Sequence, residues 1–411
     1  MKEFVKQNRE YVFNILNDGE AALFFSGCLV KKTGDEDYPF SVNRNFYYMT
    51  GLRDKNLILY LEKAKGETRQ VLFLERPDPE KEKWVGEVIK ETEAKALSGI
   101  ECVKYTDGFN EEIEDSLFKN RIGAVYLDME KRRFSDSSQA LLFGEFLKKR
   151  YPYVDVRDIY PAVSDRRTIK AESEIENIKK AVEITKKGIY SMMKNVKPGM
   201  YEYEVEAYFD FELKKAGVFD KAFSSIVAGG INGTVLHYSR NNCLIKENSL
   251  VLCDVGAAWN LYSGDITRTF PANGKFTQRQ KDIYNIVLEG NYLIQDMIKE
   301  GIPFKSLNES LKDYYAEELK TIGLIKEKDE VSKYYWHGVS HLLGLETHDV
   351  GRHNEGLLKA GMVLTVEPGL YIAEEEIGIR IEDDVAVTKA GCVNLSADII
   401  KKPEDIENFM L

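Results

Sequence analysis

Residues 161–411 repeat one succession of segments twice: two helices, an irregular segment and a β-hairpin. Apolar residues at helical spacing, ended by glycine, predict the helices, and paired apolar runs predict the hairpins. The helices are expected at 171–196, 201–217, 277–301 and 306–323, and the hairpin strands at 248–260, 262–272, 361–372 and 377–389. Such a repeat predicts two half-domains packed around a pseudo-twofold axis, with a site in the crevice between them.

Residues 1–160 form another region, in which strand-like and helix-like segments alternate. Apolar runs predict strands at 56–62, 69–75 and 123–129, and helical spacing predicts a helix at 137–150. The charged stretch RPDPEKEKW, residues 76–84, predicts an exposed loop. With 411 residues, of which 43% are hydrophobic, the chain can bury a substantial core. We therefore expect a fold of the α/β class, taken to include α+β. One domain is expected at 1–160 and a second at 161–411.

Charge and cysteine usage exclude several classes of protein. A formal net charge of −11 disfavours sequence-independent binding to nucleic acid, which usually needs a basic surface. No apolar run approaches the roughly 18–20 residues that span a bilayer, and the first residues lack the apolar segment of a signal peptide. The five cysteines are scattered and show no C-x-x-C spacing, which is typical of reduced thiols. We expect a cytoplasmic protein that binds neither nucleic acid nor membranes.

Each hairpin carries two acidic residues, Asp254 and Asp265 in the first and Glu367 and Glu382 in the second. A carboxylate within an apolar strand is costly unless a positive group neutralises it. For one such residue, a hydrogen-bonded or ion-paired core carboxylate is the more common structure. Here there are four, and the stretch HGVSHLLGLETHDVG, 337–351, adds three of the chain's five histidines. This combination favours metal binding.

The ligand types indicate which metal the site holds. Four carboxylates and one imidazole form a hard, oxygen-rich set, which suits manganese and tolerates cobalt, iron or zinc. A structural zinc site is disfavoured, because no cysteine pair is available. Four carboxylates would overcharge one divalent ion and balance two, so we expect two ions, with manganese first. Two such ions polarise a carbonyl and supply a nucleophile at neutral pH, which indicates hydrolysis.

The series Asp254, Asp265, His341, Glu367 and Glu382, in this order, resembles the metal ligands of the pita-bread metallopeptidases, family M24. These comprise methionine aminopeptidases, prolidases and Xaa-Pro aminopeptidases. The flanking stretches carry the same resemblance over roughly residues 165–395: DVGAAWNLYSGDITRTF, HGVSHLLGLETHDVG, GMVLTVEPGLYI and GIRIEDDVAVT. The resemblance implies that a pita-bread catalytic domain with an internal pseudo-twofold repeat follows the N-terminal domain.

The N-terminal region narrows the resemblance. NRNFYYMTGL, 43–52, followed by strand pairs and RPDPEKEKW, resembles the N-terminal domain of Xaa-Pro aminopeptidases (aminopeptidase P), the creatinase/prolidase type. Methionine aminopeptidases usually lack a domain of this size, and creatinases lack the metal ligands. The resemblance thus implies a metalloexopeptidase that releases the first residue of peptides with proline second. Prolidase, which cleaves Xaa-Pro dipeptides, remains the alternative, and an inactive pita-bread binding module is a further one.

The resemblance also implies roles for the ligands. Asp265 and Glu382 would bridge the two metals, Asp254 would complete the shell of one metal, and His341 with Glu367 that of the other. A metal-bridging hydroxide would attack the carbonyl before proline, with Glu367 as the proton shuttle.

Three further histidines are expected at the substrate. His237, in TVLHYSRNN, and His348 occupy related places in the two half-repeats, and the resemblance implies that both contact the substrate and stabilise the tetrahedral intermediate. A structural histidine is the alternative for His237. His337 resembles the family's pocket histidine on the proline side. The fifth histidine, His353, lies outside the matched stretches, and we expect it at the surface.

Several charged residues are expected to support the ligands. Arg380 alternates with Glu382 along one expected strand, so it can orient that carboxylate and bind substrate. Asp349, Asp383 and Asp384 are expected to have structural or supporting roles.

The expected partners are peptides and further copies of the chain. Family members are commonly dimers or tetramers, so we expect a homodimer or homotetramer. The stretch 76–84 is a candidate to reach a neighbouring subunit's site.

Overall fold

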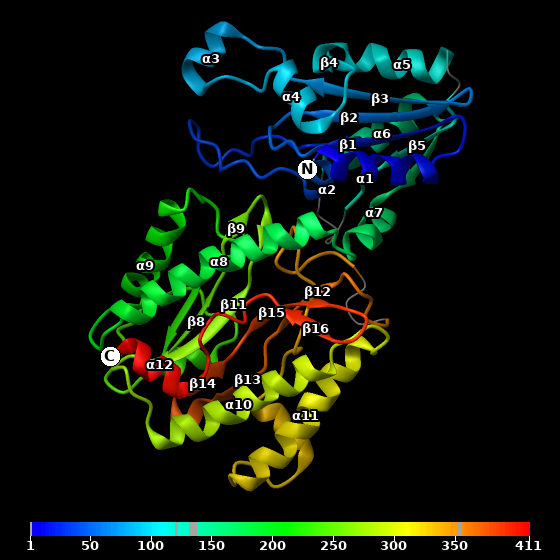
Figure 1. Ribbon diagram of the computed structural model, residues 1–411. Helices are drawn as coiled ribbons and strands as arrows, with labels where there is room; N and C mark the ends of the chain where they lie inside the picture. Colours follow the sequence, from blue (N-terminus) through cyan, green and yellow to red (C-terminus); the bar gives the residue numbers. More distant parts are fainter. Residues whose placement is uncertain (1, 120–121, 131–137, 352–355) are drawn as a thin grey trace. The chain divides into compact units, whose positions relative to one another are not determined.

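A six-stranded sheet is the centre of the first of two units, Met1–Ser164 and Asp165–Leu411, into which the computed structural model divides the chain (Figure 1). The structure describes residues 2–119, 122–130, 138–351 and 356–411. The strands of this sheet lie in the order β4-β3-β2-β1-β5-β6. β2 is antiparallel to β1 and β3, and the other pairs are parallel. Their bounds are β1 Glu20–Phe25, β2 Ile58–Ala64, β3 Glu67–Leu74, β4 Val103–Tyr105, β5 Ala124–Leu127 and β6 Asp155–Asp158.

Helices precede, connect and follow the strands of this mixed sheet. Their bounds are α1 Lys2–Ile15, α2 Arg44–Thr50, α3 Pro79–Val85, α4 Glu91–Ser98, α5 Phe109–Lys119, α6 Gln139–Arg150 and α7 Tyr160–Arg167, with the short 3-10 helix η1 at Thr106–Gly108. α5 and α6 pack on one face, where Phe109 and Leu147 join a core with Leu23 and Phe73 from the strands. Burial of these side chains holds the layers together. The expected strands at 56–62, 69–75 and 123–129 are confirmed, as is the helix at 137–150 over its described residues.

The expectation of a loop at residues 76–84 was wrong, because α3 begins within it. The Asp78 carboxylate accepts hydrogen bonds from the backbone N–H groups of Glu80 and Lys81, and Pro79 occupies the first turn. Both features stabilise a helix start without an apolar face. The expected exposure is confirmed, since 88% of Trp84 is accessible to solvent.

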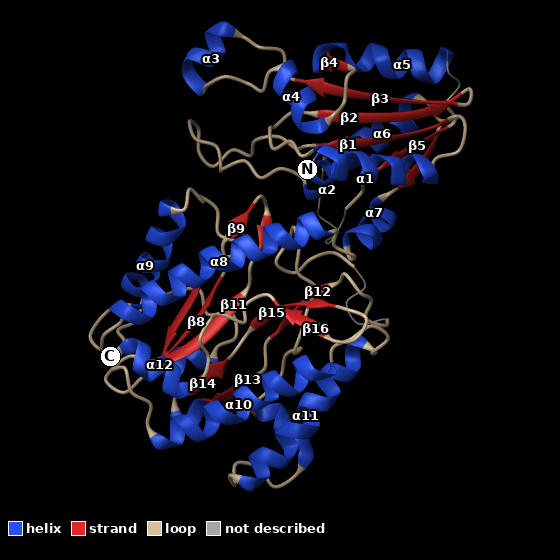
Figure 2. Cartoon of the chain, in the orientation of Figure 1, coloured by secondary structure: helices blue, strands red, loops and turns tan. Residues whose placement is uncertain are grey.

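The second unit contains two helical layers with strands between them (Figure 2). The helices are α8 Glu172–Asn195, α9 Glu202–Lys215, α10 Gln278–Met297, α11 Phe304–Thr321 and α12 Pro403–Met410, with 3-10 helices η2 Gly230–Thr234, η3 Lys328–Lys333 and η4 Ala373–Glu375. The strands are β7 Ile226–Gly229, β8 Leu250–Val255, β9 Ala258–Trp259, β10 Tyr262–Ser263, β11 Ile266–Pro271, β12 Val363–Val366, β13 Gly369–Ile372, β14 Ile377–Arg380, β15 Asp383–Val387 and β16 Cys392–Asn394. The predicted capping box of Thr277 and Gln280 opens α10.

The strands of the second half-repeat differ from expectation, because each is interrupted. β12 pairs with β15, and β13 with β14. The first break falls at Glu367 and Pro368, where proline has no N–H for a ladder, and the second at Ile381 and Glu382. The two glutamates therefore lie in breaks between strands rather than within strands. In the first half, β8 and β11 pair as expected, with the small β9–β10 ribbon between them.

The two halves join along β11. The backbone N–H of Glu382 donates to the carbonyl of Thr267 at 3.1 Å, and that of Arg380 to the hydroxyl of Thr269 at 3.2 Å. These bonds bring the second half's break at 381–382 alongside the start of β11, next to Asp265.

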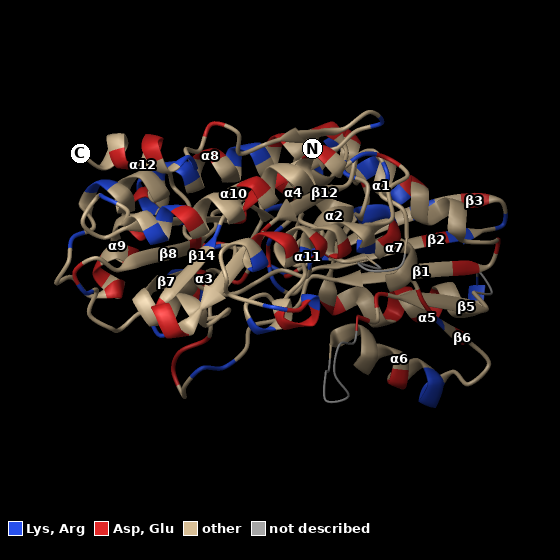
Figure 3. Cartoon of the chain, turned by 90° about the horizontal axis from the view of Figure 1, so that it is seen from below, with Lys and Arg blue, Asp and Glu red and all other residues tan. Residues whose placement is uncertain are grey.

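The outer helices carry both charges. On α8, Lys179 pairs with Glu176, and Lys180 and Lys187 with Glu183. Figure 3 shows acidic and basic residues mixed over the helices. Within the described ranges, no helix is both long and apolar enough to cross a membrane.

Candidate metal centre

Ligands from both halves meet beside β11. One side-chain ligand atom each from Asp265, His341 and Glu382 lie within 4.8 Å of one another. His341 Nε2 lies 3.4 Å from Asp265 Oδ2 and 3.6 Å from Glu367 Oε1. Asp265 and Glu382 are buried, and His341 is half-buried. Four of the five expected ligands are thus connected by these distances.

Threonine hydroxyls hold two of the carboxylates. Thr267 Oγ1 donates to Glu382 Oε2 at 2.7 Å, and Thr365 Oγ1 lies 3.3 Å from Glu367 Oε1. Thr365 Oγ1 also accepts from the backbone N–H of His341 at 3.1 Å. Each threonine lies two residues from an acidic residue, Asp265 or Glu367, and the spacing of two places side chains on one face of an extended chain. The hydroxyls therefore fix the orientation of the acid groups.

The imidazole of His341 is oriented by its own backbone. Its Nδ1 lies 3.0 Å from the carbonyl oxygen of Leu342, a contact that requires a proton on Nδ1. The other nitrogen, Nε2, then faces Asp265 and Glu367. A histidine whose outer nitrogen bonds a carbonyl is the usual arrangement of a metal ligand.

The carboxylates carry more negative charge than their surroundings balance. Burial, with the charges of Asp254 and Asp384, raises the pKa of Asp265 well above its usual range. Burial and the charge of Asp265 do the same to Glu382, and burial raises the pKa of Glu367.

One oxygen of Asp254, Oδ1, is buried without a hydrogen-bond partner. Buried polar atoms are seldom left unpaired. An unpaired carboxylate oxygen, an imidazole nitrogen that faces two acid groups and raised carboxylate pKa values fit a cationic ligand. Oxygen-rich donors of this kind suit divalent metals. The residues present therefore fit a divalent metal.

Arg380 was expected to orient Glu382 from a shared strand face, and among the described residues its guanidinium forms no direct hydrogen bond with that carboxylate. The guanidinium donates to Asp254 Oδ2 at 2.6 Å, to Thr267 Oγ1 at 3.0 Å and to the phenol oxygen of Tyr371 at 3.1 Å. Arg380 ends β14, and Glu382 lies beyond the strand, so the two do not alternate on one strand face. Arg380 is linked to Glu382 through the hydroxyl of Thr267, which donates to that carboxylate, and through the attraction of their charges.

His337 lies next to the carboxylates as a neutral group. Its Nε2 lies 2.8 Å from the phenol oxygen of Tyr371, and its Nδ1 lies 2.8 Å from the carbonyl of Gly338. Burial lowers the pKa of His337 to about 3, with smaller effects from the charges of Arg380 and His237. Nδ1 is also 3.8 Å from Glu367 Oε2.

The other two expected substrate histidines are exposed. The ring centre of His348 lies 4.3 Å from that of His341, so this imidazole borders the carboxylate cluster. His237 follows η2 on the segment between β7 and β8. The expectation for His353 falls outside the described residues.

The three other acidic residues expected to have supporting roles each contact a partner. Asp349 binds Arg167 at 2.6 Å and Lys170 at 2.9 Å. Asp383 binds Arg268 and Lys401, and Asp384 accepts from the backbone N–H of Asp265 at 3.0 Å. Each carboxylate thus has a structural contact, as expected.

Three supporting residues were missed in the sequence. Thr267 and Thr365 could have been found, because each is two residues from an expected ligand in an extended segment. Tyr371 carries no such local signal, since its partners His337 and Arg380 come from different segments.

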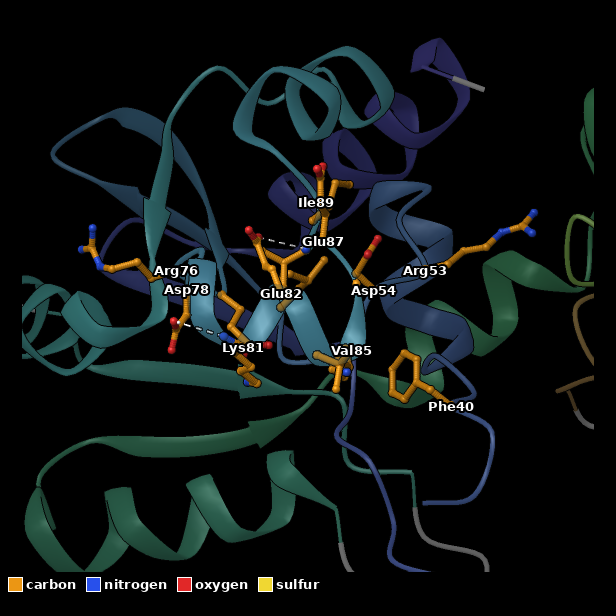
Figure 4. Close-up of a pocket in the computed structure, with 15 residues that line it drawn as sticks. Phe40, Arg53, Asp54, Arg76, Asp78, Lys81, Glu82, Val85, Glu87 and Ile89 are labelled. Atoms are coloured by element: carbon orange, nitrogen blue, oxygen red, sulfur yellow. Dashed lines mark hydrogen bonds and ion pairs between the residues drawn. The ribbon is translucent and has the colours of Figure 1, made fainter. Parts of the chain in front are cut away.

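A cavity of about 230 Å³ lies in the first unit. Its lining residues all fall between positions 40 and 89 and include none of the expected site residues. Figure 4 shows its lining, which includes charged side chains of α3 and of the loops before it. Lys81 pairs with Glu75 at 2.5 Å, and the carboxylate of Asp78 caps α3. Several of the lining charges thus already have partners within the first unit.

Comparison with known proteins gives two family matches. Metallopeptidase family M24 matches residues 176–389, and the aminopeptidase P N-terminal domain matches residues 5–126. The first range contains all nine expected site residues.

Full-length relatives give the same result. An Xaa-Pro aminopeptidase of Escherichia coli (strain K12) is 34% identical over 430 residues, which cover 99% of this chain and 97% of the relative. A solved structure from Bacillus anthracis, assigned as an aminopeptidase P, is 46% identical with a TM-score of 0.98, and covers 100% of this chain and 98% of its own. A zinc-substituted E. coli aminopeptidase P in complex with product is 32% identical with a TM-score of 0.91 and the same coverage.

Proposed function

The chain belongs to metallopeptidase family M24, on its aminopeptidase P branch, and we propose that it releases the first residue of peptides whose second residue is proline. It is a metal-dependent aminopeptidase, a hydrolase whose substrates are peptides. The observation that carries the proposal is the convergence of Asp265, His341 and Glu382 within 4.8 Å, in a chain that matches Xaa-Pro aminopeptidases over its whole length.

We propose that five residues hold two divalent ions, with manganese first and cobalt, iron or zinc as alternatives: Asp254, Asp265, His341, Glu367 and Glu382. Asp265 and Glu382 are the proposed bridging ligands, because both are buried and both lie near His341. When bound, such ions polarise the scissile carbonyl and lower the pKa of a water to near neutrality, so that a bridging hydroxide can serve as the nucleophile.

The chain's own groups would bind substrate and move the proton. Glu367, half-buried between the hydroxyl of Thr365 and the imidazole of His341, is the proposed proton shuttle, the role that the resemblance to family M24 implies for it. His237 and His348, both exposed, are proposed to donate to the substrate carbonyl as its oxygen gains charge. His337, which is neutral, is proposed to border the proline ring.

Arg380 is proposed to support substrate binding through the residues that it holds in place. Its guanidinium is buried and bonds both Asp254 and Tyr371, and Tyr371 in turn bonds His337. Through these contacts Arg380 would fix the direction of one metal ligand and of the proline-side histidine.

A peptide digest tests the proposal. The manganese-loaded protein is given an Xaa-Pro dipeptide and, separately, an Xaa-Pro-Yaa-Zaa peptide, and products are identified by mass spectrometry. We expect release of the first residue from the longer peptide, abolished by a chelator and by Asp265→Ala. Cleavage of the dipeptide alone would indicate a prolidase. If the metal-loaded protein cleaves neither peptide, the chain is an inactive binding module.

We also propose a homodimer or homotetramer in the cytoplasm, with no nucleic-acid or membrane partner. The net charge of −11 and the cysteines, none of them in a disulfide, support this location and this lack of nucleic-acid binding.

A further inference from the structure

Glu202, the first residue of α9, is a completely buried carboxylate outside the expected site. Its Oε1 accepts hydrogen bonds from the backbone N–H of Gly229 and from Asn232 Nδ2, both at 2.8 Å. Its Oε2 accepts from the phenol of Tyr238 at 2.7 Å and from the backbone N–H of Cys243 at 2.9 Å. Four donors thus satisfy one buried charge, and no lysine or arginine of the described residues forms an ion pair with it.

All four donors belong to one stretch of chain, residues 229–243, which we name the His237 segment. Gly229 and Cys243 are its two ends, so the carboxylate closes the segment into a loop. The backbone N–H of Glu202 also donates to the carbonyl of Cys243 at 3.0 Å. Tyr238, the direct neighbour of His237, is a third point of attachment. The exposed imidazole therefore projects from a backbone that is fixed on both sides.

The other side of the His237 segment packs on the second half-repeat. Tyr238 and Leu236, which flank His237, share a hydrophobic cluster with Tyr371 of β13. Tyr371 bonds His337 Nε2 at 2.8 Å. The contacts of Glu202 thus hold His237 near the proposed proline-side group.

We propose that Glu202 is a positioning residue for substrate: through Tyr238 and the two ends of the His237 segment, it fixes where His237 meets the peptide. This inference rests on the proposed function. A charged acceptor suits the position, because carboxylate hydrogen bonds are stronger than those of a neutral amide. The competing explanation is that Glu202 only stabilises the fold, and the two explanations differ in what a variant does to substrate binding.

The variant Glu202→Gln keeps the side-chain shape and one carbonyl oxygen. Its NH2 group, however, would face the N–H of Cys243, which cannot accept a hydrogen bond. We expect kcat/KM for an Xaa-Pro-Yaa-Zaa peptide to fall about tenfold, a coupling common between groups in contact. We expect most of this loss in KM, with the bound metal, measured by elemental analysis, unchanged.

A double-mutant cycle with His237→Ala separates positioning from stability. If Glu202 acts through His237, Glu202→Gln should lower kcat/KM less than about twofold once the imidazole is removed. The matched control is Glu174→Gln on α8, another buried glutamate, which accepts from the phenol of Tyr262 at 2.9 Å and lies outside the His237 segment. Its effect should be the same with and without His237.

The outcomes are distinct. Equal losses from Glu202→Gln in both backgrounds, a loss of metal, or unchanged kinetics would each overturn the role of Glu202 while the proposed function stands. A wild-type protein that cleaves no Xaa-Pro peptide would overturn both. Should Glu202→Gln fail to fold, Tyr238→Phe, which removes only one of the four donors, takes its place in the cycle with the same expectations.

Discussion

Asp265 lies where the charges of the site converge. It faces the imidazole of His341, it shares its neighbourhood with Glu382, and its backbone N–H donates to Asp384. The four carboxylates of the proposed centre and Asp384 make the site unstable as a set of free anions, and a bound cation removes that cost. The same residues are therefore expected to favour metal binding and to destabilise the metal-free protein.

Replacement of Asp265 by Asn should thus act in opposite directions with and without metal. In the metal-free protein the pKa of Asp265 is raised above the value of about 3.9 that an unfolded chain has. Folding then loses stability as the pH rises from that value through the raised pKa, by about 1.4 kcal/mol per unit of difference. At pH 8 we expect Asp265→Asn to raise the melting temperature of the metal-free protein, and to abolish the stabilisation by manganese. Calorimetry with and without chelator measures both.

Asp383 provides the matched control for this experiment. Burial alone would raise its pKa, but Arg268 and Lys401 lower it below the usual range. Its contribution to stability is present above the ordinary carboxylate pKa and is lost as the pH falls through the lowered value. Asp383→Asn should therefore lower the melting temperature at pH 8 with or without metal. If Asp265→Asn lowers the metal-free melting temperature as well, the charge argument is wrong.

At the scale of elements, sequence periodicity predicted the long helices and the paired strands well. It failed where a single local contact decides the structure. α3 has no apolar periodicity and depends on the cap by Asp78. The strands of the second half are interrupted at 367–368, where Pro368 has no N–H for a ladder, and at 381–382. The register that joins β11 to residues 380–382 depends on packing between the halves, which no local pattern encodes.

The packing of β14 against η2 depends on one residue, Gly378. A Cβ atom on Gly378 would overlap the carbonyl of Gly233. We expect Gly378→Ala to lower the free energy of unfolding in urea by about 1–3 kcal/mol, the usual cost of overpacking. Catalytic efficiency should fall too, since η2 is part of the His237 segment. Gly391→Ala, where no atom lies within 4 Å of the added methyl, should change neither quantity. If Gly378→Ala is as stable as Gly391→Ala, the backbone of η2 accommodates the added methyl group and the packing argument is wrong.

For the whole molecule, the convergence of Asp265, His341 and Glu382 could be predicted, because each lies in a short motif whose residue types restrict the chemistry. The long-range contacts around them could not be predicted. Arg380 reaches Asp254 across 126 positions of sequence, and Tyr371 reaches His337 across 34. Such pairs form only when the half-repeats pack, so the sequence indicated a supporting arginine but assigned it to Glu382, the nearer acid.

The expected assembly of the chain can be tested at α3. In the first unit, Figure 1 shows α3 held away from the sheet by loops, and on it Trp84 and Val85 are 88% and 63% exposed. Exposed tryptophan beside a second apolar side chain is characteristic of a contact with another protein surface. We expect a dimer or tetramer in sedimentation velocity, and for Trp84→Ala at least a tenfold weaker association, the size of loss at an interface hot spot. Lys83→Ala, on the same helix, should leave the assembly unchanged, because its exposed pair with Glu80 contributes little.

If residues 76–84 also reach a neighbouring subunit's site, the specific activity of Trp84→Ala will fall on dilution at concentrations where the wild type keeps its activity. A fully active monomer would contradict both the assembly and this role.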